Sequence, residues 1–586
     1  MKVHLGFALS ALTVLGCGPS IAARTAPPPV HHDAMAAAAD PRAVAAALAM
    51  LERGGSATDA AIAASLVLGL VEPQSSGIGG GGFLLHFDEA SHALTSYDGR
   101  EMAPAGADAD MFLGADGAPL PFREAVASGA SIGVPGLIAM LESVHRAHGR
   151  LPWSELFEPA ISLAEQGFEV SERMSRIIAF GNRDGMLARR PEVRAYLFDE
   201  AGAPWPAGHV IVNQAYADTL RAIQRDGSRG LLTGPIAQDI VAVAHEGERP
   251  SSITLDDLAA YAPRELEPVC GAFRSHRVCS MGGTASGAIP MLQILGLYEA
   301  ARPTPVGADD IDDWSAFLWA TRLAFADRNH YLGDHAFVPV PKGLTDPRYL
   351  ASRARRMGLE AAPTGELPPG DPSPVVGGES LRDHWGWDHT LEVPGTSHLS
   401  IVDHEGNAVV MTQTVESEFG AMRMTHGFFL NNELTDFSLE PTRLGGPVAN
   451  AVAPHKRPRS SMTPTLIFDV DGNLEVAIGS PGGSAIIGYV ALTIIGYVDW
   501  RMPFDEAVEL PHLTATSSIV RGELDRLGEA RASALRSRGW TLEQTTMEAS
   551  GLYGVAVEEG HLVGADDSRR PGVARLAPSV HRSPER

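Results

Sequence analysis

A predicted β-hairpin constrains the fold of this chain more than any other feature of its sequence. Apolar and polar side chains alternate over residues 396–403, as they do in a half-buried strand, and residues 408–414 have the composition of a returning strand. The sequence His-Glu-Gly-Asn between them is typical of a tight turn. If the aspartate and the alanine that flank this turn pair with each other, Thr414 lies opposite Ser397, one position from Thr396.

Self-cleavage is the chemistry that this hairpin suggests, because a threonine directly follows a Pro-Gly turn at its start. Hydrolysis of the bond between Gly395 and Thr396 would create a new N-terminal threonine. Its free α-amine, with an unperturbed pKa of about 7.7–8.0, could then accept the proton of its own hydroxyl near neutral pH. The sequence therefore predicts a self-processed enzyme whose nucleophile is Thr396.

The composition indicates a globular protein rather than a disordered one, because 44% of the 586 residues are apolar and 20% are charged. The formal net charge is −25. Nucleic acid is therefore not an expected partner, since phosphate binding requires a basic surface. We interpret the acidity as a contribution to solubility.

Residues 1–16 have the pattern of a secretion signal, with an apolar stretch that is too short for a stable membrane span. The stretch ends in Val-Leu-Gly-Cys17, which resembles a bacterial lipoprotein cleavage box and makes Cys17 a candidate lipidation site, although the leucine is larger than usual there. The alternative is ordinary cleavage after Ala22 or Ala23. Residues 17–40 are predicted to be a tether. An exported protein is expected, either periplasmic or anchored to the bacterial envelope by this lipid alone.

Cys270 and Cys279 flank eight residues that could form a hairpin in which the two cysteines face each other. An exported chain permits a disulfide between them, and the alternative is two buried free thiols. No cysteine or histidine has the spacing of a metal site, so no metal is predicted. Residues 77–82 satisfy G-x-G-x-x-G, but they follow a helix and precede a strand, whereas the dinucleotide motif follows a strand and precedes a helix. No cofactor is therefore expected.

Helical and strand patterns occur in blocks along the chain. The expected order is a helical stretch at 43–70 that Ser56 could interrupt or restart, strands at 83–87 and 94–98, helices at 130–265 and 290–331, a flexible linker at 360–395, and then strands with helices near 484–500 and 504–510. The linker ends at the proposed scissile bond, where flexibility would favour cleavage.

Three further segments carry polar or glycine-rich patterns, and each has a purely structural alternative. Residues 479–484 could form an oxyanion hole at Gly482 and Gly483, or only a turn before a helix. Residues 456–461 place two serines after three cations, and they could bind a carboxylate or form a solvated basic turn. Residues 431–436 combine amides and acids, and they could hold an ammonium group or cap a turn.

Together these segments resemble the γ-glutamyltransferase (γ-glutamyltranspeptidase) family, and the resemblance extends from about residue 40 to the C-terminus. Each segment alone is a weak signal, but six of them occur in the family order. They are residues 79–83, 100–104, 396–400, 428–433, 456–464 and 479–483.

The resemblance implies the α+β fold of an N-terminal-nucleophile hydrolase, a four-layer αββα sandwich. Cleavage before Thr396 would give a large subunit, residues 41–395, and a small subunit, residues 396–586, which stay together as a heterodimer. Thr396 would attack the γ-carbonyl of a γ-glutamyl compound such as glutathione. The acyl-enzyme would then react with water or with the amine of an amino acid or peptide.

The resemblance also implies roles for individual residues around the nucleophile. Thr414 would hydrogen-bond the nucleophile, and the backbone N–H groups of Gly482 and Gly483 would stabilise the oxyanion.

The remaining implied roles concern the two charged ends of the substrate. Arg100 would bind the substrate α-carboxylate with the help of Ser460 and Ser461, since a planar guanidinium matches a carboxylate. Glu433 and Asp436 would bind the α-ammonium.

Two departures from the family pattern affect the expected specificity. Glu416 stands where the family usually has asparagine, which would bring a third acid near Glu433 and Asp436. Either one acid is then protonated, or the cationic end of the substrate differs. Residues 439–449 are also shorter than the lid of other family members and contain no aromatic residue. An acylase of glutaryl-like amides is therefore an alternative function, and a tethered peptide-binding protein without catalysis is a further one.

Overall fold

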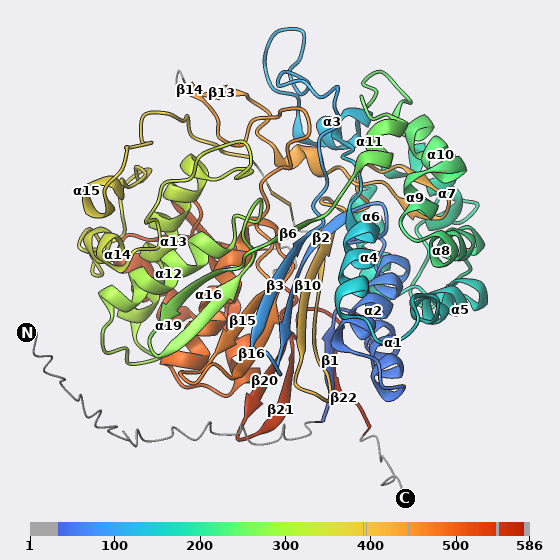
Figure 1. Ribbon diagram of the computed structural model, residues 1–586. Helices are drawn as coiled ribbons and strands as arrows, with labels where there is room; N and C mark the ends of the chain where they lie inside the picture. Colours follow the sequence, from blue (N-terminus) through green and yellow to red (C-terminus); the bar gives the residue numbers. More distant parts are fainter. Residues whose placement is uncertain (1–32, 391, 394, 444–445, 546–549, 579–586) are drawn as a thin grey trace, which may run out of the picture.

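The computed structural model describes residues 33–390, 392–393, 395–443, 446–545 and 550–578, and two antiparallel sheets form its centre (Figure 1). The first sheet has seven strands in the order β22-β1-β9-β10-β2-β3-β6. Their bounds are β22 (Val573–Leu576), β1 (Met35–Ala38), β9 (Thr396–Val402), β10 (Ala408–Thr414), β2 (Gly81–Asp88), β3 (Ala93–Asp98) and β6 (Arg264–Leu266).

The second sheet packs against the first and has six strands in the order β21-β20-β16-β15-β8-β7. Their bounds are β21 (His561–Asp566), β20 (Tyr553–Glu558), β16 (Leu474–Gly479), β15 (Thr465–Phe468), β8 (His276–Ser280) and β7 (Val269–Phe273).

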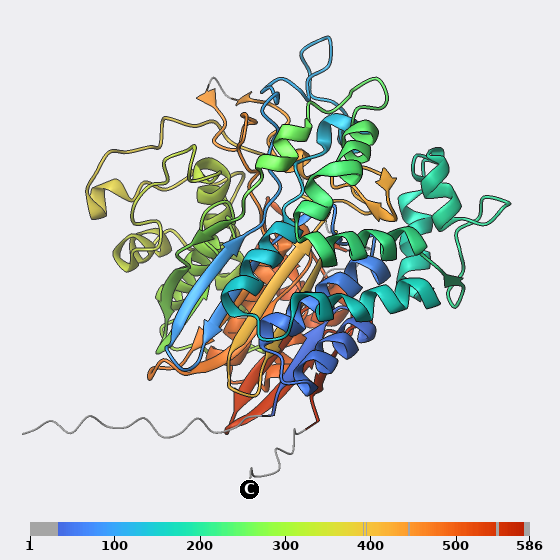
Figure 2. The same ribbon diagram turned by 45° about the vertical axis from the view of Figure 1, so that its right-hand side comes forward.

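Helices cover the outer face of each sheet, so that the molecule has four layers. The first sheet carries α1 (Pro41–Glu52), α2 (Ala57–Val71) and α4 (Leu137–His148), with α5 (Glu158–Gln166) and α8 (Gln214–Asp226) outside them. The second sheet carries α12 (Ala288–Ala301) and α16 (Ile486–Ile494), and α13 (Ile311–Tyr331) packs on α12. The layers are also visible from a second angle in Figure 2. The predicted α+β four-layer sandwich is confirmed.

The other helices and strands are short and lie around these layers. The helices are α3 (Phe122–Ala127), α6 (Glu172–Gly181), α7 (Pro191–Leu197), α9 (Arg229–Leu232), α10 (Gly234–Ala244), α11 (Leu255–Ala260), α14 (Pro347–Ala354), α15 (Ser373–Val376), α17 (Phe504–Val508), α18 (Leu524–Leu527) and α19 (Glu529–Ser537). The strands are β4 (Phe168–Glu169), β5 (Val210–Ile211), β11 (Met424–Thr425), β12 (Phe428–Phe429), β13 (Thr442–Arg443), β14 (Gly446–Pro447), β17 (Leu513–Thr514), β18 (Ile519–Gly522) and β19 (Thr541–Gln544).

The expectation of a tether over residues 17–40 is wrong at its C-terminal end. Residues 35–38 form β1, which is fully buried and pairs with β22 on one side and β9 on the other. Alanine is a weak strand former by itself, but hydrogen bonding on both edges and contact with α1 override that preference. The predicted secretion signal and Cys17 lie outside the described residues. Within the described ranges, no helix combines the length and apolarity that a membrane crossing requires.

The hairpin forms as predicted, but its register differs by one residue. Thr414 pairs directly with Thr396 rather than with Ser397. The reason is the turn, which closes one residue earlier: the N–H of Asp403 donates to the carbonyl of Asn407 over 2.9 Å. A three-residue loop remains, and its Gly406 has a φ of +86°, the left-handed conformation that such loops require.

The linker predicted over residues 360–395 is anchored near its end. The buried Asp388 forms an ion pair of 2.8 Å with Arg459, and the buried Glu392 forms one of 2.7 Å with Arg328. The expected flexibility is therefore wrong just before the proposed scissile bond, because these charged pairs fix the chain there.

The two remaining cysteines are bonded to each other. Cys270 on β7 and Cys279 on β8 are directly opposite in the pair of strands and form a disulfide. The predicted hairpin and disulfide are confirmed. They reinforce one edge of the second sheet.

Candidate active site

One small cavity brings together residues from six separate segments of the sequence. It is lined by nine of the predicted site residues: Arg100, Thr396, Thr414, Glu416, Glu433, Asp436, Ser460, Ser461 and Gly483. Gly482 directly precedes the last of these. The sheet order explains the gathering, because the start of β9 and the end of β10 lie side by side at the cavity, and residues of the other segments line the same cavity.

The two threonines are adjacent at the strand tips. The hydroxyl oxygens of Thr396 and Thr414 lie 3.5 Å apart. The Thr414 hydroxyl donates to the carbonyl oxygen of Gly395 over 2.6 Å and accepts from the N–H of Glu416 over 2.8 Å. Thr414 therefore contacts both the candidate nucleophile and the carbonyl of the candidate scissile bond.

Gly395 cannot be replaced by a larger residue without a change of the backbone. A Cβ there would lie 2.0 Å from the carbonyl oxygen of Glu416. On the other side of the bond, the Arg570 guanidinium donates to the carbonyl oxygen of Thr396 over 3.0 Å. Arg570 was not predicted from the sequence, because it lies on a separate C-terminal segment and has no recognisable motif.

The glycine loop after β16 has the backbone that only glycine adopts readily. Gly482 has a φ of +140° and Gly483 a φ of +57°. A Cβ on Gly483 would also approach the carbonyl oxygen of Glu392 to 2.7 Å. The loop runs through a short 3₁₀ turn, Gly483–Ala485, into α16. Backbone N–H groups at the start of a helical segment favour negative charge, so this loop can stabilise an oxyanion.

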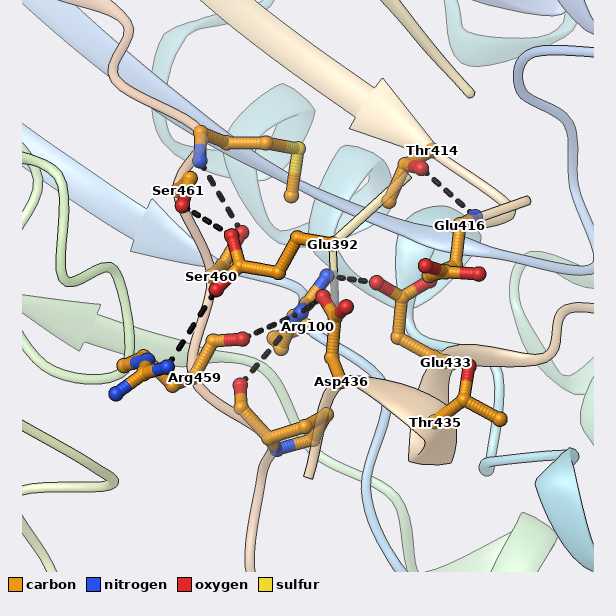
Figure 3. A network of polar contacts seen from close by, with 12 residues as sticks. Arg100, Glu392, Thr414, Glu416, Glu433, Thr435, Asp436, Arg459, Ser460 and Ser461 are labelled. Carbon is orange, nitrogen blue, oxygen red and sulfur yellow. Dashed lines mark hydrogen bonds and ion pairs between the residues drawn. The ribbon is translucent and has the colours of Figure 1, made fainter. Parts of the chain in front are cut away.

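Arg100 is buried, and four of the five N–H groups of its guanidinium have a partner (Figure 3). Its guanidinium forms ion pairs with Glu433 and Asp436 and also donates to the backbone carbonyls of Pro458 and Arg459. A carboxylate ligand that binds this guanidinium at two points must therefore displace at least one of these partners.

Glu416 stands in a strained backbone conformation beside these acids. Its φ of +78° is unfavourable for a glutamate, and such strain is often found at functional sites. One carboxylate oxygen of Glu416 accepts hydrogen bonds from Ser417 and Asn432. Burial, followed by the charges of Asp436 and Glu433, raises its pKa well above the usual value.

The other carboxyl groups also hold protons more tightly than usual. Burial raises the pKa of Asp436 to about 8, although Arg100 opposes the shift. Burial and the neighbouring Glu433 raise the pKa of Glu101 well above its ordinary value. The charge of Glu433 therefore disfavours the ionised form of Glu101, on top of the effect of burial. Of the two explanations that the sequence left open, protonation of at least one acid is therefore favoured.

Three acids of the cavity wall each have a buried carboxylate oxygen that lacks a donor. Oε1 of Glu416, Oε2 of Glu433 and Oδ1 of Asp436 accept no hydrogen bond from any residue that the structure describes. A buried acceptor without a donor is costly, so a bound ligand that supplies N–H groups here would gain affinity.

The two serines differ in their surroundings. The Ser461 hydroxyl donates to Glu392 and accepts from Arg328 over 2.6 Å. The Ser460 hydroxyl accepts from the N–H of Met462 over 3.3 Å. Arg328 and Glu392 were not predicted as site residues, since neither belongs to a motif and only the fold brings them to Ser461.

Comparison with known proteins decides the family. The family model described as Gamma-glutamyltranspeptidase matches residues 43–577. The chain belongs to the γ-glutamyltranspeptidase family. The family that the six motifs predicted is thereby confirmed.

The relatives with assigned names match most or nearly all of this chain. It is 32% identical over 587 residues to the glutathione hydrolase proenzyme of Bacillus subtilis, covering 98% of both chains. It is 34% identical over 527 residues to that of Escherichia coli, covering 86% of this chain and 87% of the relative. The crystal structure of a cephalosporin acylase from Bacillus halodurans has the same fold, with a TM-score of 0.81 and 24% identity over 96% of this chain and 99% of the other.

Proposed function

We propose that this protein cleaves itself before Thr396 and then acts on γ-glutamyl amides such as glutathione. The products of self-cleavage are a large subunit, residues 41–395, and a small subunit, residues 396–586, which remain one enzyme. The small subunit transfers the γ-glutamyl group to water or to the amine of an amino acid or peptide. Family membership and the grouping of both threonines at the strand tips support this function.

Self-cleavage begins with attack of the Thr396 hydroxyl oxygen on the Gly395 carbonyl carbon. The hydrogen bond from Thr414 to the carbonyl oxygen supports this step, because it stabilises the negative charge that develops there. The C–N bond breaks, an ester forms on Thr396, and its nitrogen takes up a proton. Water then hydrolyses the ester to give the carboxylate of Gly395 and the free α-amine of Thr396.

Turnover uses the groups that self-cleavage has released. The Thr396 hydroxyl attacks the γ-carbonyl while the α-amine accepts its proton, and the amine leaving group departs with that proton. Gly482 and Gly483 would donate to the tetrahedral oxyanion, and one lost donor of this kind typically costs about 100- to 1000-fold in rate. Water or an acceptor amine then attacks the acyl-enzyme by the same route in reverse.

The three carboxylate oxygens without donors support the assignment of the substrate. An α-ammonium offers three N–H groups, and Glu416, Glu433 and Asp436 present acceptors for them. When the ammonium pairs with Asp436 and Glu433, the Arg100 guanidinium is released to bind the α-carboxylate. A γ-glutamyl group carries both of these charges on one carbon, so it can exchange with the ion pairs of the unliganded site.

The comparison of two chromogenic anilides tests this function. We expect the γ-glutamyl anilide to react with a kcat/KM roughly 100-fold or more above that of the glutaryl anilide, because the latter lacks the ammonium and leaves buried acids unpaired. Faster turnover of the glutaryl compound would favour the acylase alternative, which the short segment 439–449 supports. Loss of both activities in processed protein would favour a binding function.

A Glu416→Gln variant is expected to change the pH dependence of substrate binding. The raised pKa values of Glu416 and Asp436 mean that both acids lose protons as the pH rises, and ammonium binding then strengthens. Glutamine resembles the protonated acid, so KM should match the wild type at pH values where Glu416 is protonated. Above the raised pKa of Glu416 we expect a KM roughly fivefold or more above wild type, from the loss of one charge-assisted hydrogen bond.

Initial rates from pH 6 to 9 measure this effect. Glu379→Gln, a change at an exposed glutamate outside the cavity, is the matched control and should leave the profile unchanged. A Glu416→Gln profile parallel to that of the wild type would show that Glu416 does not contact the ammonium.

We also propose export to the periplasm or the envelope surface, which rests on the pattern of residues 1–16 and on Cys17. Intact-mass measurement of both mature fragments tests it. A large fragment that begins at Cys17 with an acyl mass increment supports lipidation, and one that begins after Ala22 or Ala23 supports ordinary cleavage. A fragment that still begins at Met1 contradicts export.

A further inference from the structure

A histidine that the reaction does not use lies between the two sheets, directly behind the nucleophile. His398 is the third residue of β9, is fully buried, and has both ring nitrogens in hydrogen bonds. Nδ1 lies 2.8 Å from the hydroxyl oxygen of Thr412, and Nε2 lies 3.0 Å from that of Ser400. The ring is therefore held at both ends by neighbouring side chains of β9 and β10.

The hydrogen-bond directions fix the tautomer of this ring. The Ser400 hydroxyl donates its proton to the carbonyl oxygen of Tyr553 on β20 over 2.9 Å, so it can only accept from the ring. Nε2 of His398 therefore carries the proton, and Nδ1 accepts from Thr412. Burial lowers the pKa of His398 to about 3, so the ring stays neutral at any pH at which an enzyme of this kind works.

The ring also touches the strand that leads to the glycine loop. A Cβ on Gly479, the last residue of β16, would lie 2.3 Å from Cε1 of His398 and 2.6 and 2.8 Å from its two nitrogens. The backbone at Gly479 is outside the left-handed region, so the need for glycine here comes from the ring alone. Gly479 pairs with Tyr553, the residue that receives the Ser400 hydrogen bond.

We propose that His398 is a positioning residue that sets the spacing between the Thr396 hydroxyl and the N–H donors of Gly482 and Gly483. The His398 ring acts as a rigid, neutral spacer. Thr396 lies two residues before it on β9, and the ring lies against Gly479, the residue after which the glycine loop begins. This inference rests on the proposed function, because it assumes that the loop donates to the oxyanion.

Such a role affects the chemical step and leaves substrate capture intact. Oxyanion donors act on the transition state, whereas Arg100 and the acids that bind the charged end of the substrate belong to other segments. A shift of the glycine loop relative to Thr396 should therefore lower kcat with little change in KM.

A double-mutant cycle between His398 and Gly479 tests the proposal. His398→Ala removes the spacer, and Gly479→Ala forces the ring and the strand apart. We expect each single variant to lower kcat on the γ-glutamyl anilide by about 10- to 100-fold with KM within about threefold of the wild type. In the double variant the new methyl group occupies part of the space that the ring has left. If the two substitutions acted independently, the fold-losses in kcat of the single variants would multiply. We expect the kcat of the double variant to be about tenfold higher than that value.

Val476→Ala is the matched control for general loss of packing. Val476 is buried on β16, three positions before Gly479, so its side chain points to the opposite face of the strand. Its effect should combine additively with that of His398→Ala. Additivity in the Gly479 cycle as well, or a rise in KM equal to the fall in kcat, would overturn the proposal.

Two further measurements apply if a variant does not complete self-cleavage. The rate of self-cleavage, followed on a denaturing gel, then replaces kcat in the cycle. We expect the double variant to cleave faster than the product of the two single fold-losses predicts, because the strand of Thr396 has moved. His398→Gln, which retains an N–H donor for Ser400, should process and react faster than His398→Ala; equal rates contradict the proposal. If the wild type hydrolyses the glutaryl anilide instead, the cycle is measured on that substrate, so failure of the proposed function is distinguished from failure of the spacer.

Discussion

Replacement of Thr396 with alanine is expected to leave the chain uncut and to abolish turnover. The hydroxyl that attacks the Gly395 carbonyl is absent, and without cleavage no free α-amine forms. Because removal of a nucleophile leaves only residual catalysis, we expect a rate loss on the order of 10⁴-fold or more. A denaturing gel after long incubation and initial rates with the γ-glutamyl anilide measure the two effects.

Thr396→Ser is the matched control, because it keeps the hydroxyl and should still cleave. The smaller fragment of the wild type should begin with Thr396 when it is sequenced from its amino end. Efficient cleavage of the alanine variant, or a different first residue, would show that the scissile bond is misassigned.

Replacement of Arg100 with alanine should have the second-largest effect, and it should act mainly on substrate capture. Loss of one partner from a buried charge pair costs about 3–5 kcal/mol, which corresponds to a kcat/KM roughly 10²- to 10³-fold or more below wild type. Two physical changes contribute. The α-carboxylate loses its guanidinium, and Glu433 and Asp436 lose the cation that lowers their pKa values, so they are protonated more readily and bind an ammonium less well.

Steady-state kinetics and a cleavage time course separate this effect from misfolding. Self-cleavage depends on Gly395, Thr396 and Thr414, whereas the ion pairs and hydrogen bonds of the Arg100 guanidinium join it to other residues, so the cleavage rate should fall far less than kcat/KM. Arg100→Lys keeps the charge without the planar fork and should be intermediate. An equal loss of cleavage and capture would assign Arg100 a purely structural role.

The sequence was sufficient to predict the four layers and most of the cavity, because the family motifs place glycines and charged groups at strand ends. The hairpin register was wrong by one residue, since the turn closes between Asp403 and Asn407, a choice that depends on local hydrogen bonds. Strand β1 was missed because a short alanine run has no strand pattern of its own. Arg328, Glu392 and Arg570 were missed because tertiary contacts alone bring them to the site.

The position of β1 has a consequence for the order of events in the life of this protein. Cleavage before Thr396 would leave β1 on one polypeptide, clamped between β22 and β9 of the other. Neither product could then assemble its central sheet unaided, and separation of the two would expose the interior of both. Folding must therefore be complete while the precursor is still a single chain, and the mature pair should melt together rather than dissociate.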